Sequence, residues 1–99
     1  MNAKLVCEVV EVTPAMAALW LRQNRVNRPV DEDLVRRYAV VMKSGGWLLN
    51  GKTVVFDEDG LMRNGQHRCM AAVQAEVGFV TVVVRGASRE AFSNLGEEK

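Results

Sequence analysis

The spacing of apolar residues changes several times along this 99-residue chain, and that change constrains the fold more than any other feature. Runs of closely spaced β-branched residues predict strands, whereas apolar residues three or four positions apart predict helices. Proline and glycine separate the two kinds of segment. The pattern predicts a small α+β domain with a mixed sheet and three main helices. A chain of this length is typical of one domain, so residues 1–99 are expected to form a single unit.

Capping residues delimit the expected helices. The first is expected over residues 14–23, with Thr13 as its N-cap and Pro14 at its first position. The second follows Asp31, another N-cap candidate, and ends at Gly45-Gly46, where glycine allows a left-handed stop. The third is expected to begin at a glycine turn after the second hairpin strand.

Four segments predict strands, and two of them form a hairpin. Gly60 stands in the connecting turn, where a positive φ is needed. The acidic residues of this turn, 57–59, are expected to be solvated rather than to bind a metal. The expected strands are residues 5–12, 53–56, 61–63 and 79–85.

Charge and apolar run length exclude two classes of protein. Thirteen basic and twelve acidic residues give a net charge of +1, which argues against a polycationic protein that coats duplex DNA. The apolar runs fall short of the roughly 20 residues that span a bilayer, and no secretory signal is recognisable. We therefore expect a cytoplasmic protein without a membrane partner. Cys7 and Cys69 lack metal-site spacing and are expected to be buried thiols, so no metal site is predicted.

The pentapeptide from Asn64 to Arg68 carries the strongest chemical signal. A helix that begins here presents unpaired amides and the positive end of its dipole, and Gly65 allows an anion to approach the backbone. His67 and Arg68 place cationic donors in the first turn, where they oppose the dipole unless an anion joins them. We therefore expect a phosphate site. In the alternative interpretation, Asn64 caps the helix, Arg68 forms a salt bridge and His67 is a satisfied polar residue.

A second basic patch lies within residues 22–28, which include Arg22, Arg25 and Arg28 but no acidic residue. Arginine and amide side chains suit hydrogen bonds to phosphate, sugar or base edges, so this patch is a candidate nucleic-acid-binding surface. The alternative is a solvated loop that the acidic residues 31–33 neutralise.

Over residues 24–88, the chain resembles the N-terminal domain of the partition protein ParB and its structural relative sulfiredoxin. Three features occur in the order found in that family. Arg28-Pro29 precedes an acidic-capped helix, Gly45-Gly46-Trp47 leads towards a strand, and a Gly-x-x-Arg turn enters a helix. That last turn, residues 65–68, reads Gly-Gln-His-Arg and is similar to ParB's Gly-Glu-Arg-Arg box and sulfiredoxin's Gly-Cys-His-Arg motif. Both motifs hold nucleotide phosphates in the family.

The resemblance implies a nucleotide ligand, ATP or CTP, with Mg²⁺. Arg68 would clamp two phosphate oxygens, His67 would donate a further hydrogen bond, the amides of Gly65 and Gln66 would form the cradle, and Arg28 would approach from the second patch. Gln66 stands where sulfiredoxin has its catalytic cysteine and ParB its acidic residue. Sulfinic-acid reduction is therefore not supported, and a metal ion would find a weaker ligand.

Three classes of function remain open. A nucleotide-binding domain could also hydrolyse the nucleotide or transfer a phosphoryl group, in connection with DNA. A nucleic-acid-binding or nuclease-type module would use Arg22, Arg25 and Arg28; similar small domains are described as ParB-like nucleases, and some occur in bacteriophages. A non-catalytic protein would bind a partner through an apolar surface around Trp20 or Trp47, although tryptophans at these spacings are more typical of the core. A second copy of the chain is a further candidate partner.

Overall fold

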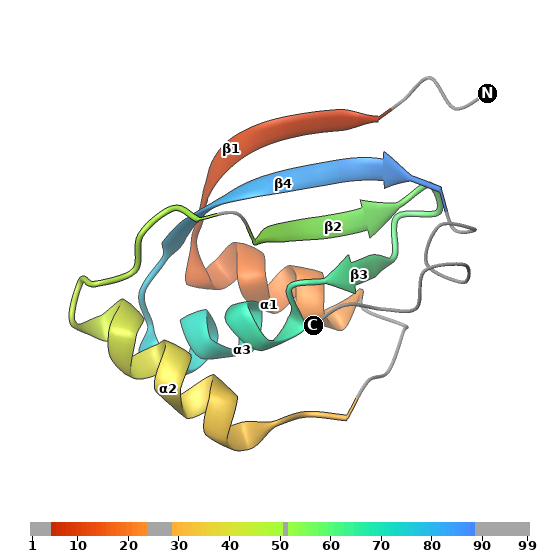
Figure 1. Ribbon diagram of the computed structural model, residues 1–99. Coiled ribbons are helices and arrows are strands. Elements are labelled where there is room, and N and C mark those ends of the chain that lie inside the picture. Colours follow the sequence, from red (N-terminus) through yellow and green to blue (C-terminus); the bar gives the residue numbers. More distant parts are fainter. Residues whose placement is uncertain (1–4, 24–28, 51, 89–99) are drawn as a thin grey trace.

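The computed structural model describes residues 5–23, 29–50 and 52–88. Within them lie three helices and a four-stranded mixed sheet, which confirms the predicted α+β class (Figure 1). The order is β1 (Val6–Val12), α1 (Pro14–Arg22), α2 (Glu32–Lys43), β2 (Thr53–Asp57), β3 (Met62–Asn64), α3 (Gln66–Ala75) and β4 (Phe79–Ala87).

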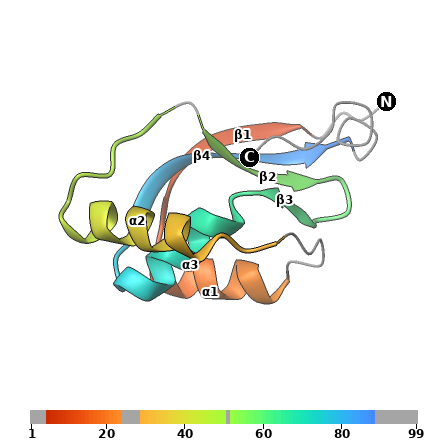
Figure 2. The ribbon, with the colours of Figure 1, turned by 60° about the horizontal axis from the view of Figure 1, so that its bottom comes forward.

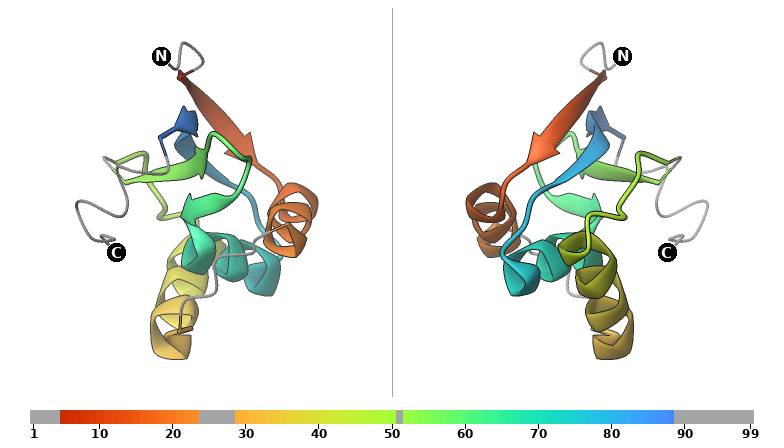
Figure 3. Two further views of the ribbon diagram at one scale, coloured as in Figure 1. Left: turned by 90° about the vertical axis from the view of Figure 1, so that its right-hand side faces the viewer. Right: turned by 90° about the vertical axis from the view of Figure 1, so that its left-hand side faces the viewer.

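The last strand of the sequence lies inside the sheet, whose order is β1-β4-β2-β3. Strand β4 pairs antiparallel with β1 and parallel with β2, while β2 and β3 form the predicted hairpin. All three helices lie on one side of the sheet (Figures 2 and 3). Because β2 and β4 are parallel neighbours, the chain between them crosses over through β3 and α3, which places the start of α3 beneath β2.

The predicted caps of the first two helices are confirmed. Thr13 Oγ1 accepts a hydrogen bond from the amide of Met16 at 3.1 Å, and Asp31 Oδ1 accepts one from the amide of Leu34 at 3.1 Å. At the other end of α2, Gly45 has a φ of 80°, as predicted for a glycine stop. These local signals therefore fix where both helices begin and where α2 ends.

Aromatic side chains join the helices to the sheet. Trp20 of α1 meets Phe56 of β2 edge to face, with ring centroids 5.0 Å apart. Trp47 lies between Tyr38 and Phe79, and its ring centroid is 5.3 Å from that of Tyr38 and 5.8 Å from that of Phe79. Trp20 is only 7% exposed, so it belongs to the core, as its helical spacing indicates, and it does not present a surface to a partner. Its ring contributes to the core because it closes the space between α1 and the sheet.

The two cysteines differ in exposure. Cys69 is fully buried in α3, as predicted, but Cys7 is exposed, which corrects the expectation for that residue. Cys7 lies on β1, an edge strand in which only Val12 is buried. The β-rich sequence of this segment indicates a strand, but it cannot show that the helices cover only the end of it.

The buried face of α3 consists of small residues around one arginine. Ala71, Ala72 and Ala75 are buried, whereas Val73 is 39% exposed. Small side chains let a helix approach its neighbours closely. As a result, the first turn of α3 lies against β2, where the candidate site is found.

In the part of the chain that the structure describes, no helix combines the length and the apolar character that crossing a bilayer requires.

Candidate anion site at the start of α3

Gly65 is the N-cap of α3 and has a left-handed backbone, with φ 116° and ψ 1°. A Cβ atom at this position would lie 2.9 Å from Cγ2 of Val54, closer than side-chain packing allows. Only glycine fits this conformation and this contact without strain. The structure thus gives Gly65 a packing role that operates with or without a bound anion.

No side chain caps the start of α3, in contrast to α1 and α2. The first backbone bond of the helix runs from the amide of Cys69 to the carbonyl of Gly65, at 3.0 Å. The amides that precede it in the first turn lie too early in the helix to bond to one of its carbonyls. The alternative interpretation in which Asn64 caps this helix is therefore wrong. The positive end of the dipole carries no side-chain oxygen acceptor here.

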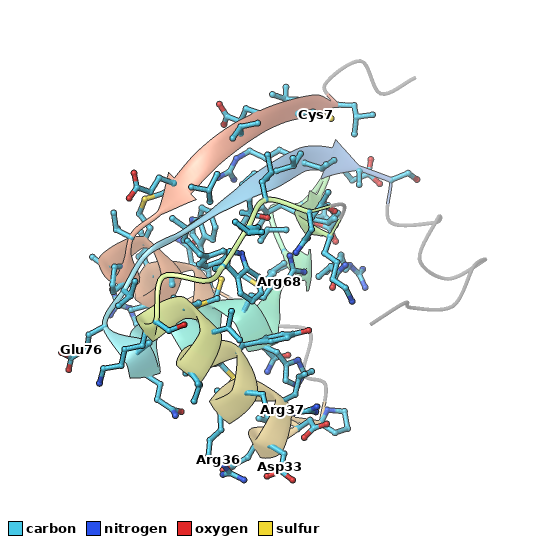
Figure 4. The ribbon with its side chains drawn as sticks, turned by 60° about the vertical axis from the view of Figure 1, so that its left-hand side comes forward. Cys7, Asp33, Arg36, Arg37, Arg68 and Glu76 are labelled. Carbon is cyan, nitrogen blue, oxygen red and sulfur yellow. The ribbon has the colours of Figure 1, made fainter. Side chains whose placement is uncertain are left out.

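Arg68 enters the interior from this first turn. Its residue is 5% exposed, and Figure 4 shows the side chain between the sheet and the helices, whereas Arg36 and Arg37 project outward from α2. Nη2 donates to the carbonyl oxygen of Thr53 at 2.9 Å. Nη1 is buried and has no hydrogen-bond partner. The salt bridge of the alternative interpretation is not formed with any described residue.

Burial lowers the pKa of the Arg68 guanidinium, while interactions with Cys69 and Tyr38 raise it. Arginine nevertheless stays protonated in proteins, so this region holds a positive charge. A buried charge is normally paired, because removing an ion from water costs several kcal/mol. Nη2 of Arg68 donates to a neutral carbonyl oxygen, and Nη1 has no hydrogen-bond partner. The guanidinium therefore lacks the counter-ion that a buried charge ordinarily requires.

Burial raises the pKa of the neighbouring Cys69 thiol to about 12, although the charge of Arg68 lowers it. The thiol is therefore protonated at neutral pH and is a poor nucleophile. This agrees with the interpretation of Cys69 as a core residue and gives no support to sulfiredoxin-type chemistry.

Gln66 provides a second orphaned atom in the same turn. Its side chain is half-buried, and the buried Oε1 has no hydrogen-bond partner. An amide oxygen can accept a hydrogen bond or contact a hard cation. The described residues contain no group of three or more His, Cys, Asp or Glu side chains that could hold a metal. Gln66 Oε1 is therefore a single unsatisfied oxygen acceptor in the first turn of α3.

His67 makes a contact that the sequence does not reveal. Its Nε2 accepts a hydrogen bond from the amide of Asp31, at 3.0 Å, which joins the N-termini of α2 and α3. The expectation was that His67 donates to phosphate, whereas here this ring nitrogen is an acceptor. The contact agrees with the alternative interpretation of a satisfied polar residue.

The second basic patch is described only in part. Arg22 is exposed at the end of α1 and lines a surface depression with Asp59 and Leu61 of the β2–β3 turn. Arg25 and Arg28 lie outside the described residues. Of the acidic residues expected to neutralise the patch, Asp31 caps α2 and Asp33 pairs with Arg36.

The hairpin turn corrects part of another expectation, because Glu58 and Asp59 are exposed as expected but Asp57 is buried. Asp57 is 2% exposed, not solvated, and accepts hydrogen bonds from the amides of Asp59 and Leu61 and from Nε of Arg63, at 2.8, 3.0 and 2.8 Å. Burial raises the pKa of Asp57, but these hydrogen bonds and the Arg63 charge outweigh it, so the pKa lies below the ordinary 3.8. Aspartate at the first and glycine at the fourth position of the turn signals this geometry, but not the burial.

Comparison with protein-family models, with curated proteins and with solved structures finds no match to this chain. The order of strand, glycine turn and helix expected from the sequence is present at residues 62–75. The resemblance to ParB and sulfiredoxin therefore depends on the three sequence features within residues 28–68.

Proposed function

We propose that this protein binds the terminal phosphates of a nucleotide at the first turn of α3. One observation carries the proposal: the buried guanidinium of Arg68 lacks a partner for Nη1, in the first turn of a helix without a side-chain cap. A phosphate there would supply the missing counter-ion and accept from the amide of Gln66 at the start of the helix. Nη1 is itself covered, so binding requires neighbouring side chains to move aside.

The depth of Arg68 favours a small ligand over a nucleic acid. With the residue 5% exposed, the phosphates of a duplex, which lie on the outside of a wide cylinder, would not reach the guanidinium. A terminal phosphate is mobile and carries more charge than a phosphodiester. ATP or CTP, with Mg²⁺ carried by the phosphates, has the required chemistry. Gln66 cannot ionise, so we propose binding as the principal activity and a ParB-like role linked to DNA as its context.

Calorimetric titration tests this proposal directly. ATP, CTP, GTP and their diphosphates would be added with and without Mg²⁺ to the wild type, to Arg68→Met and to Arg37→Met. Arg37 is an exposed arginine of α2, so its variant changes the net charge equally without touching the site. We expect binding by the wild type and by Arg37→Met only. Absence of binding by every protein would refute the proposal, and chromatography of the nucleotide products would show whether hydrolysis follows.

Nucleic-acid binding through Arg22 is the second candidate. It is favoured by the exposed position of Arg22, which lines a depression of the surface. An affinity for DNA that falls steeply with salt, and that Arg22→Ala reduces, would support this function. A flat salt response would contradict it.

A further inference from the structure

His67 connects the starts of two helices that are far apart in the sequence. The amide of Asp31, the N-cap of α2, donates to Nε2 of His67 at 3.0 Å, and His67 is the second residue of α3. A ring nitrogen that accepts a hydrogen bond carries no proton, so the imidazole is neutral in this arrangement, with its proton on Nδ1. His67 is also the sole histidine of the 99-residue sequence.

Protonation of His67 removes the acceptor. An imidazolium carries N–H groups on both nitrogens, so the amide of Asp31 would face another donor. An imidazole in water titrates near about 6.5, which places the change within a mild pH range. The contact between α2 and α3 is therefore sensitive to pH by its chemistry.

Charged groups on both sides of the junction act on the imidazole. The carboxylates of the first turn of α2 favour its protonation, whereas the positive end of α3 and the Arg68 guanidinium oppose it. An anion at the start of α3 would offset those opposing charges. Arg63 of β3 forms an ion pair with Asp57, which partly offsets its charge. The charged groups that act on the imidazole from the start of α2, from the start of α3 and from β3 are Asp31, Glu32, Asp33, Arg68 and Arg63.

We propose that His67 is a proton-operated latch between α2 and α3. In its neutral form it holds the amide of Asp31 and fixes the start of α2 against the first turn of α3. On protonation it releases that amide and offers an N–H donor to an anion bound in the turn. The first half of this proposal, the release of the Asp31 amide, depends only on the observed hydrogen bond. The second half, the donation to a bound anion, rests on the proposed function. Anion binding and proton uptake are then coupled.

Nuclear magnetic resonance of the ¹⁵N-labelled, ligand-free protein tests the first half. The imidazole nitrogens of His67 and the amide of Asp31 would be followed from pH 5 to pH 8.5, above the range where carboxylates titrate, near about 4. We expect Nε2 to lack a proton at the alkaline end, and both sets of signals to change with one midpoint. In His67→Gln, whose side-chain oxygen accepts but does not titrate, the Asp31 amide should stay constant. An Asp31 amide that ignores the imidazole titration would overturn the latch.

Sulfate binding tests the second half, because sulfate remains a dianion throughout this range whereas phosphate itself titrates. Because His67 must be protonated to donate to the anion, affinity should rise severalfold between pH 7.5 and pH 6, in step with the imidazole titration followed by magnetic resonance. His67→Gln should show no such rise. A pH-independent affinity would overturn the coupling while leaving the proposed function intact. Failure of sulfate and of every nucleotide to bind would overturn both the coupling and the proposed function, and the resonance experiment would still decide the latch.

Discussion

Replacing Arg68 by methionine separates an anion-binding guanidinium from a structural one. Methionine keeps a long, flexible, apolar stem in the interior and removes the charge. It also removes the donor to the carbonyl of Thr53, which lies 2.9 Å from Nη2. The variant therefore changes two free-energy contributions of opposite sign.

The two contributions are of similar size. A hydrogen bond from a charged group contributes about 1.5–3 kcal/mol to stability. Burying a cation without a counter-ion costs several kcal/mol, and Arg68 is in that state on its Nη1 side. Without anion, we expect the free energy of unfolding of Arg68→Met to lie within about 2 kcal/mol of the wild type, in either direction. With a nucleotide at a hundred times its Kd, the wild type should gain about 2.7 kcal/mol and the variant nothing.

Urea and thermal unfolding, with and without nucleotide, measure both quantities. For a domain of this size, a gain of that order raises Tm by about 10 °C or more. Arg37→Met is the charge-matched control and should keep the full nucleotide response. The reasoning is refuted if Arg68→Met loses more than about 3 kcal/mol without ligand while no phosphate compound shifts the Tm of the wild type. Arg68 would then be a structural link to Thr53 alone.

Three further predictions concern the surroundings of the site. Gly65→Ala should lower the free energy of unfolding, measured in urea, by about 2–4 kcal/mol, because the added Cβ would lie 2.9 Å from Val54 in a left-handed backbone. A decrease of less than about 0.5 kcal/mol would show that the backbone relaxes freely. The lowered pKa of Asp57 means that its stabilisation is complete above about pH 4 and is lost as the pH falls through the folded-state pKa. Acid titration followed by circular dichroism should therefore show a steeper loss in the wild type than in Asp57→Asn, and equal slopes would contradict this. A thiol-specific maleimide at pH 7.5 should modify the exposed Cys7 but should modify Cys69 only after urea is added, because burial protects this thiol and raises its pKa to about 12. Modification of both cysteines in the native protein would contradict the buried position of Cys69.

The sequence by itself determined the order of the elements and most of their ends. Thr13, Asp31 and Gly45 act within a few residues of their own positions, through bonds to nearby amides and carbonyls. Such signals are readable because their partners are fixed by the local backbone. The glycine turn that leads into α3 was found for the same reason.

Only the tertiary structure decided what the residues of the candidate site contact. Arg68 reaches the carbonyl of Thr53, His67 reaches the amide of Asp31, and Gly65 packs on Val54, all of them partners from other elements. These contacts depend on how the crossover from β2 to β4 brings α3 beneath the sheet and beside α2. Residue spacing along one element encodes its periodicity and not its neighbours in space, so the sequence located the turn while packing set the direction of each side chain within it.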